Sequence, residues 1–141
     1  MVSGHIAVKK KAMAVIKEFG EGNFEAPMEQ LPGKKAFIND TIEQVRRNLK
    51  AVSADTRELI GAAAEGQLDY RADASKHKGE YNTIVQGINT TLDNIILPVN
   101  EAVSVLQAME QGDLTVKVKG QYKGQLEDFK QTVNNTIEKI S

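Results

Sequence analysis

Residues 108–118 read Ala-Met-Glu-Gln-Gly-Asp-Leu-Thr-Val-Lys-Val, and this stretch decides the fold. A run with the apolar spacing of a helix leads into it, and Gly112 can adopt the left-handed conformation that ends a helix. Leu114 follows two residues later, and Val116 and Val118 come next. The pattern predicts a helix that ends at the glycine and leads into a connector, which its apolar side chains pin to the helices.

The same pattern occurs three times along the chain. The helix-ending segments are Glu21-Gly22-Asn23-Phe24, Glu65-Gly66-Gln67-Leu68 and Gln111-Gly112-Asp113-Leu114. A second shared signature follows each of them, at Ile38-Asn39-Asp40-Thr41-Ile42, Ile88-Asn89-Thr90-Thr91-Leu92 and Val133-Asn134-Asn135-Thr136-Ile137. Two signatures in the same order three times indicate an internal repeat of a helix-connector-helix module.

The spacing between the two signatures divides the chain into three expected modules. The glycine precedes its asparagine by 23 residues in the second repeat and by 22 in the third, but by only 17 in the first. We therefore expect a divergent first module with a short connector over residues 5–50. A second module is expected over residues 51–96 and a third over residues 97–141.

Between the connectors, apolar residues recur at alternating steps of three and four. This heptad-like spacing predicts long helices, one over about 35–64, another over about 5–19 and a last one from about Gln125 onward. The predicted seam of these helices comprises Ile42, Leu49, Leu59, Ile88, Leu92, Ile95, Val133 and Ile137. A step of four followed by another of four around Leu92 shifts the phase of the seam.

Narrow seams on long helices indicate that more than one chain is needed. A single chain with stripes of this width cannot bury its apolar surface internally, whereas connectors of about a dozen residues can place successive helices parallel. Two chains side by side would then form a parallel four-helix bundle at each module. The predicted fold class is therefore all-α, with parallel four-helix bundles stacked in tandem in a homodimer.

Composition excludes several functions. The net charge is −1 and there is no cysteine among the 141 residues, which disfavours a nucleic-acid partner and rules out thiolate chemistry. No apolar run reaches the roughly 20 residues that span a bilayer, so a membrane would be involved only through a parent protein. No cofactor, metal site or catalytic constellation is expected.

Two kinds of polar residue invite functional readings. His5 and His77 lie in different segments without a second ligand at helical spacing, and we expect both to be exposed rather than metal ligands. Asn39, Asn89 and Asn134 fall in Asn-x-Thr sequences, but a secretory context is lacking. We expect these asparagines to form hydrogen bonds on the helix surface or beside the seam.

The repeated residues resemble HAMP domains, the signal-converting modules of bacterial chemoreceptors and sensor kinases. The third repeat carries the resemblance best, with Pro98 early in its first helix and Gly112-Asp113-Leu114 at the end of it. The resemblance implies a parallel homodimer without catalytic residues, which relays conformational signals from an upstream sensor to a downstream methyl-accepting or kinase output. The resemblance also implies that the chain is the cytoplasmic portion of an inner-membrane receptor. The connector residues expected to pack are Gly22, Phe24, Gly66, Leu68, Gly112, Leu114, Val116 and Val118.

Two other functions compete with signal relay. In the first, the N-terminal repeat folds a small-molecule pocket from Phe24, Met28, Leu31 and Phe37. In the second, the chain is an inert coiled-coil spacer. The second predicts one uninterrupted seam, and the glycine-bearing connectors argue against it.

Overall fold

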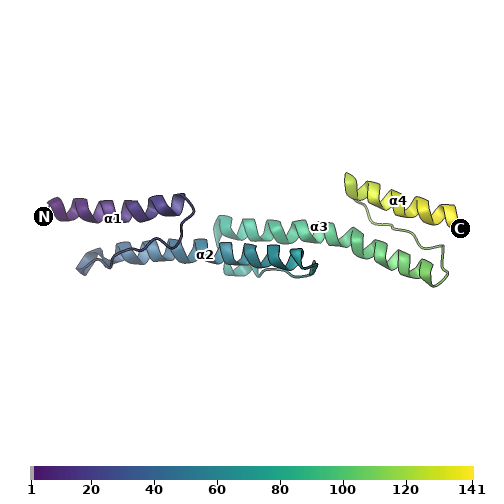
Figure 1. The fold of residues 1–141 in the computed structure, drawn as a ribbon, viewed down its shortest axis with the longest axis horizontal. Helices are drawn as coiled ribbons and strands as arrows, with labels where there is room; N and C mark the ends of the chain where they lie inside the picture. The colour runs from purple at the N-terminus through teal and green to yellow at the C-terminus, as the bar shows by residue number, and fades with distance from the viewer. Residues whose placement is uncertain (1) are drawn as a thin grey trace. The chain divides into compact units, whose positions relative to one another are not determined.

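The computed structural model describes residues 2–141, with side chains from residue 4 onward, and within that range it is all-α. Four α-helices and no strand are present there: α1 Val2–Gly20, α2 Ala36–Ala64, α3 Gly79–Glu110 and α4 Gln125–Ile140 (Figure 1). Two short 3-10 turns, η1 Gly33–Lys35 and η2 Ala74–Lys76, lie just before α2 and α3. The predicted helices and the all-α class are confirmed, whereas the four-helix bundles and the homodimer remain predictions.

The helices are long because nothing in their sequences interrupts them strongly. α2 runs without a proline from Ala36 to Ala64. α3 contains Pro98, which removes one backbone hydrogen bond, yet the helix continues through it to Glu110. The proline ring is fully buried, so packing offsets the lost hydrogen bond.

The chain divides into two compact units. The first comprises the residues up to Ile60 together with Ala72–Val85. In it, Val15 and Phe19 of α1 form a buried cluster with Ile42 of α2 and Ala26 of the connector. Lys11 pairs with Glu29 beside Asn39, whereas Phe19 lies further along near Arg46, so α1 and α2 run in the same direction (Figure 1). The expected parallel arrangement within this module is thus present.

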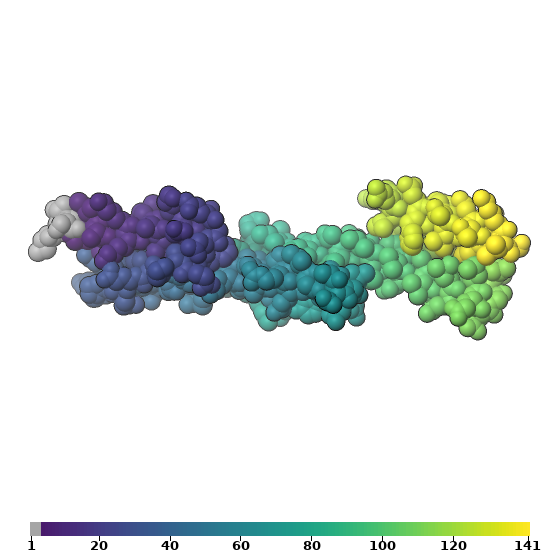
Figure 2. Space-filling view, viewed as in Figure 1, coloured from purple at the N-terminus to yellow at the C-terminus, as the bar shows by residue number. Residues whose placement is uncertain are grey.

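The second unit comprises Gly61–Arg71 and Gln86–Ser141. Ala102 and Val105 of α3 cluster with Ile137 of α4 and Val118 of the connector between them. In the space-filling view α4 lies directly on the last part of α3 (Figure 2). Each core therefore consists of two helices of one chain plus one connector.

The connectors correct one expectation. The first runs from residue 21 to 35, the second from 65 to 78 and the third from 111 to 124, so the first connector is not short. The small glycine-to-asparagine spacing arises because Asn39 lies in the first turn of α2, whereas Asn134 lies further into α4. The spacing reported the position of the asparagine in its helix rather than the length of the connector.

Candidate functional site

Each connector begins with the same backbone motif. Gly22, Gly66 and Gly112 have φ values of 92°, 83° and 96°, a conformation that side chains strongly disfavour. In the third repeat the Gly112 N–H donates to Met109 O at 2.9 Å and the Asp113 N–H donates to Ala108 O at 2.9 Å. These paired bonds form a Schellman motif, and the other two repeats have their equivalents. The glycines therefore end the helices as the sequence predicts.

Asparagine side chains hold the connectors against the following helix. Asn134 Oδ1 accepts the Val118 N–H at 2.8 Å, and its Nδ2 donates to Val118 O at 3.0 Å. Asn39 Oδ1 accepts the Leu31 N–H at 2.8 Å, and its Nδ2 donates to Glu29 O at 2.9 Å. Each side-chain amide thus accepts one backbone N–H of the connector and donates to one backbone carbonyl of it. The expected hydrogen-bonding role is confirmed for these two asparagines.

The apolar connector residues differ in how deeply they pack. Val118 is buried, with 2% of its surface exposed, and Val116 packs against the same cluster. Phe24 packs against the cluster of the first unit, with its ring edge-on to Phe19 at a centroid distance of 6.4 Å. Leu68 and Leu114 are half-buried.

The expected seam residues are brought together only in part. Ile42, Leu59 and Ile137 are buried, and Leu49 and Val133 pack against the edges of the two clusters. Ile88 and Leu92 are half-buried, and Ile95 is 43% exposed. A single chain therefore covers one side of the seam and leaves the other side open.

A carboxylate from α3 holds the end of the third connector, and sequence reasoning missed it. Glu101 accepts the Lys119 N–H at 2.6 Å, the Gly120 N–H at 3.1 Å and the Tyr122 hydroxyl at 2.5 Å. The bond from Tyr122, followed by that from the Lys119 backbone, holds the pKa of Glu101 below its usual value. The same bond, together with burial, raises the pKa of Tyr122 to about 12.

The backbone at Gly120 lies very close to the side chains of Tyr122 and Glu101. A Cβ placed on Gly120 would lie 2.6 Å from Tyr122 Cζ and 2.8 Å from Glu101 Oε1, and still closer to the Tyr122 hydroxyl. Such distances are shorter than van der Waals contact, so a side chain at position 120 would displace the ends of the Tyr122 and Glu101 side chains. A larger residue here would therefore disturb the contact between Glu101 and Tyr122.

His77 requires a second correction. The sequence predicted an exposed histidine, but the imidazole is 3% exposed and its Nε2 lies 2.6 Å from Asp55 Oδ2 of α2. It lies at the end of the second connector, where the chain turns into α3, and a charged partner compensates for its burial. His5 is exposed, as predicted.

The first connector is held by basic residues of α2. Arg46 donates to Phe24 O at 2.6 Å, and its guanidinium carbon lies 5.1 Å from the centroid of the Phe19 ring. Lys50 pairs with Glu25 at 2.7 Å. Neither contact has a local sequence signal, because each depends on which turn of α2 the connector crosses.

The residues proposed for a small-molecule pocket do not line one together. A groove of about 570 Å³ runs between α1 and the first connector, and Met28 lines it. Phe37 is 64% exposed and Leu31 is buried within the first connector, and neither borders the groove. Among the described residues no group of three or more His, Asp or Glu side chains could hold a metal ion.

The geometry defines a class of helical module, built of a helix, a glycine-capped connector and a second parallel helix. Comparison with known families agrees with it. Residues 8–50 match the HAMP N-terminal domain 3, and residues 76–141 match the HAMP domain. The chain therefore belongs to the HAMP family over these two segments. HAMP domains relay signals in chemoreceptors, and the family is non-catalytic.

One characterised protein is similar in sequence. The chain is 44% identical over 64 residues to methyl-accepting chemotaxis protein McpB of Pseudomonas aeruginosa. The aligned segment covers 45% of this chain and 9% of that protein. Over the described residues, no helix combines the length and hydropathy needed to cross a membrane.

Proposed function

We propose that the chain works as a parallel, in-register homodimer that relays a conformational change from one module to the next along its continuous helices. The modules proposed are residues 5–50, 51–96 and 97–141. The partners are a second copy of the chain and, in the parent protein, a sensor on one side and a chemotaxis or kinase-control output on the other. A cytoplasmic position inside a membrane-anchored receptor is part of the same proposal.

The observation that carries the proposal is the apolar surface left open on the helices. In α1, Ile6, Met13 and Ile16 are 47%, 61% and 48% exposed, although they lie at heptad-like steps of seven and three. In α4, Phe129 and Ile140 are 39% and 56% exposed. Burying each such side chain contributes roughly 1.5–3 kcal/mol when it is complete. A second copy with the same open stripes supplies a matching surface.

The relay follows from how the helices are shared. α2 is the second helix of the first module and the first helix of the next, and it has no break between Ala36 and Ala64. A rotation or tilt imposed at Ile42 must therefore reach Leu59. The phase shift near Leu92 gives the following junction a different packing, so that neighbouring modules prefer different states.

Cysteine cross-linking tests the homodimer. The chain has no cysteine, so a single substitution introduces the only thiol. Val45→Cys and Leu49→Cys place it on the seam side of α2, and we expect mild oxidation to join two copies at the same position. Arg47→Cys, about 200° away around the helix, is the matched control and should cross-link poorly. Equal yields at positions 45 and 47, or a monomer at high concentration, would contradict the proposal.

A further inference from the structure

The three connectors share a contact that links each one back to the helix before it. The helix residue always lies eleven positions before the helix-ending glycine: Lys11 before Gly22, Asp55 before Gly66 and Glu101 before Gly112. Lys11 pairs with Glu29, Asp55 with His77, and Glu101 with Tyr122. We call these three contacts clasps.

At the connector end, the second and third clasps occupy equivalent places, whereas Glu29 of the first lies four residues before Gly33. His77 and Tyr122 each lie two residues before a glycine at the N-terminal boundary of the next helix: Gly79, the first residue of α3, and Gly124, which precedes α4. The three repeats thus share the helix position of the contact, and the last two also share its connector position, while the chemistry changes. An incidental surface ion pair would not recur at one helical position in all three repeats.

The clasps differ in how firmly they close. Glu101 accepts three hydrogen bonds, two of them from connector backbone. The Asp55–His77 contact is a single bond but a buried one, with 3% of the imidazole exposed. Lys11 and Glu29 are 47% and 63% exposed, and ion pairs this open contribute little stability. The third clasp is therefore the tightest and the first the loosest.

We propose that each clasp is a latch which fixes the rotation of a module's first helix relative to its connector. The inference rests on the proposed relay. One residue step turns a helix by about 100°, which would carry Glu101 away from Lys119, Gly120 and Tyr122. The first helix cannot rotate far while the clasp is closed. The clasp therefore holds the module in the packing seen here and opens when the module switches.

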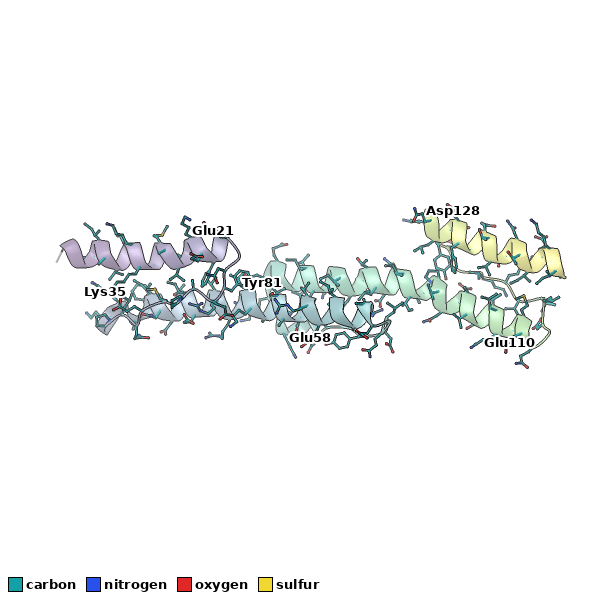
Figure 3. All side chains as sticks on the ribbon, viewed as in Figure 1. Glu21, Lys35, Glu58, Tyr81, Glu110 and Asp128 are labelled. Carbon is teal, nitrogen blue, oxygen red and sulfur yellow. The ribbon has the colours of Figure 1, made fainter. Side chains whose placement is uncertain are left out.

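Hydrogen exchange of the full 141-residue chain tests the clasp directly. Glu101→Gln removes the charge, and we expect the amides of Lys119 and Gly120 to exchange at least about tenfold faster. Glu110→Gln makes the same change at the end of the same helix (labelled in Figure 3) and should leave these amides unchanged. Tyr122→Phe is a milder variant, which removes one bond but keeps the ring over Gly120. Unchanged exchange in both clasp variants would overturn the proposal.

A transplant between repeats separates a latch from ordinary packing. His77→Tyr alone should disrupt the second clasp and speed exchange at the end of the second connector. Combining it with Asp55→Glu recreates the residue pair of the third clasp and should restore protection. Failure of the double variant to exceed the single one would mean that the pairing is not what holds the connector, and the proposal would fall.

A signalling measurement completes the test in a receptor that contains these modules. Glu101→Gln should shift the resting output, whereas Glu110→Gln should not. If exchange distinguishes the two variants but output does not, the clasp is a structural contact and the latch is refuted. That result would leave the relay standing, because the relay is judged separately by changes in helix phase.

Discussion

Replacing Asn134 with alanine offers a sharp test of how the connectors are held. The asparagine amide makes both of its bonds to one residue, accepting from the Val118 N–H at 2.8 Å and donating to Val118 O at 3.0 Å. Val118 is 2% exposed, so its freed backbone groups would gain little access to water. The neighbouring Asn135 is exposed and serves as the matched control.

The expected magnitude follows from two hydrogen bonds. Each contributes on the order of 0.5–1.5 kcal/mol, so Asn134→Ala should lower the free energy of unfolding by roughly 1–3 kcal/mol. Alanine also favours a helix more than asparagine does, by about 0.5 kcal/mol, but Asn135→Ala shares that gain. The difference between the two variants therefore isolates the connector contact. Asn134→Asp should also lower the free energy of unfolding. It retains the bond from the Val118 N–H but places a carboxylate oxygen against Val118 O.

The assay is urea unfolding at one fixed protein concentration, because association in the proposed homodimer would contribute to stability. Amide exchange at Val118 adds a local readout and should speed up in Asn134→Ala only. If Asn134→Ala and Asn135→Ala unfold at the same urea concentration, with equal exchange at Val118, then the amide does not hold the connector.

Four further outcomes follow from the structure. Leu114→Asp should destabilise the third module by roughly 1 kcal/mol or more in urea unfolding, about half the value for complete burial, because a half-buried apolar contact is lost. Unchanged stability would show that this residue contributes no packing. Gly112→Ala should cost about 1–2 kcal/mol in the same assay, because φ is 96° there. Hydrogen bonds lower the pKa of Glu101, so its contribution to stability is present above the ordinary glutamate pKa and is lost as the pH falls through the lowered value. Glu101→Gln should therefore make the free energy of unfolding depend less on pH in the acid range. An unchanged pH dependence in that range would contradict this. One residue inserted after Val52 should lock or invert receptor output by turning the downstream seam about 100°, whereas seven should largely preserve it, and equal output from both would refute helix-phase transmission.

The pKa of Tyr122 gives an independent check on the third clasp. Its hydroxyl should ionise at about 12, as followed by ultraviolet absorbance, because the hydrogen bond to Glu101 favours the protonated hydroxyl and ionisation would place a second negative charge beside that carboxylate. The pKa is raised on folding, so the stability it contributes is present below about pH 10 and is lost as pH rises toward 12. Glu101→Gln should return the ionisation toward its ordinary value. A Tyr122 titration that this substitution leaves unchanged would argue against the contact.

The helices and their ends could be predicted from the sequence because their signals are local. Heptad spacing marks α2, and a glycine such as Gly112 marks the point where a helix must stop. The clasps could not be predicted in this way, since the contact between Glu101 and Tyr122 depends on the path of the connector over the helix. One signal was present: Lys11, Asp55 and Glu101 are all charged at the same place in the repeat. Comparing repeats position by position, rather than motif by motif, would have found it.

Two predictions failed for a related reason. The first connector was expected to be short because Asn39 and Asn134 were taken as equivalent, although they lie at different depths in their helices. His77 was expected to be exposed because a single histidine carries no burial signal, and its partner Asp55 is distant in the sequence. In both cases the error concerned where the residue lies in the tertiary structure, which the local sequence pattern does not determine.

The sharing of α2 between modules also determines how such a chain can grow or shrink. The unit of addition is one connector plus one helix, since the helix already present serves as the neighbour of the new one. Joining Glu65 directly to Gly112 would delete one such unit and leave α2 leading into the third connector, with Asp55 in the place of Glu101 opposite Tyr122. A single in-frame event that breaks no helix can therefore change the number of these repeats; in the proposed relay, it would also change how many times the signal passes from one module to the next.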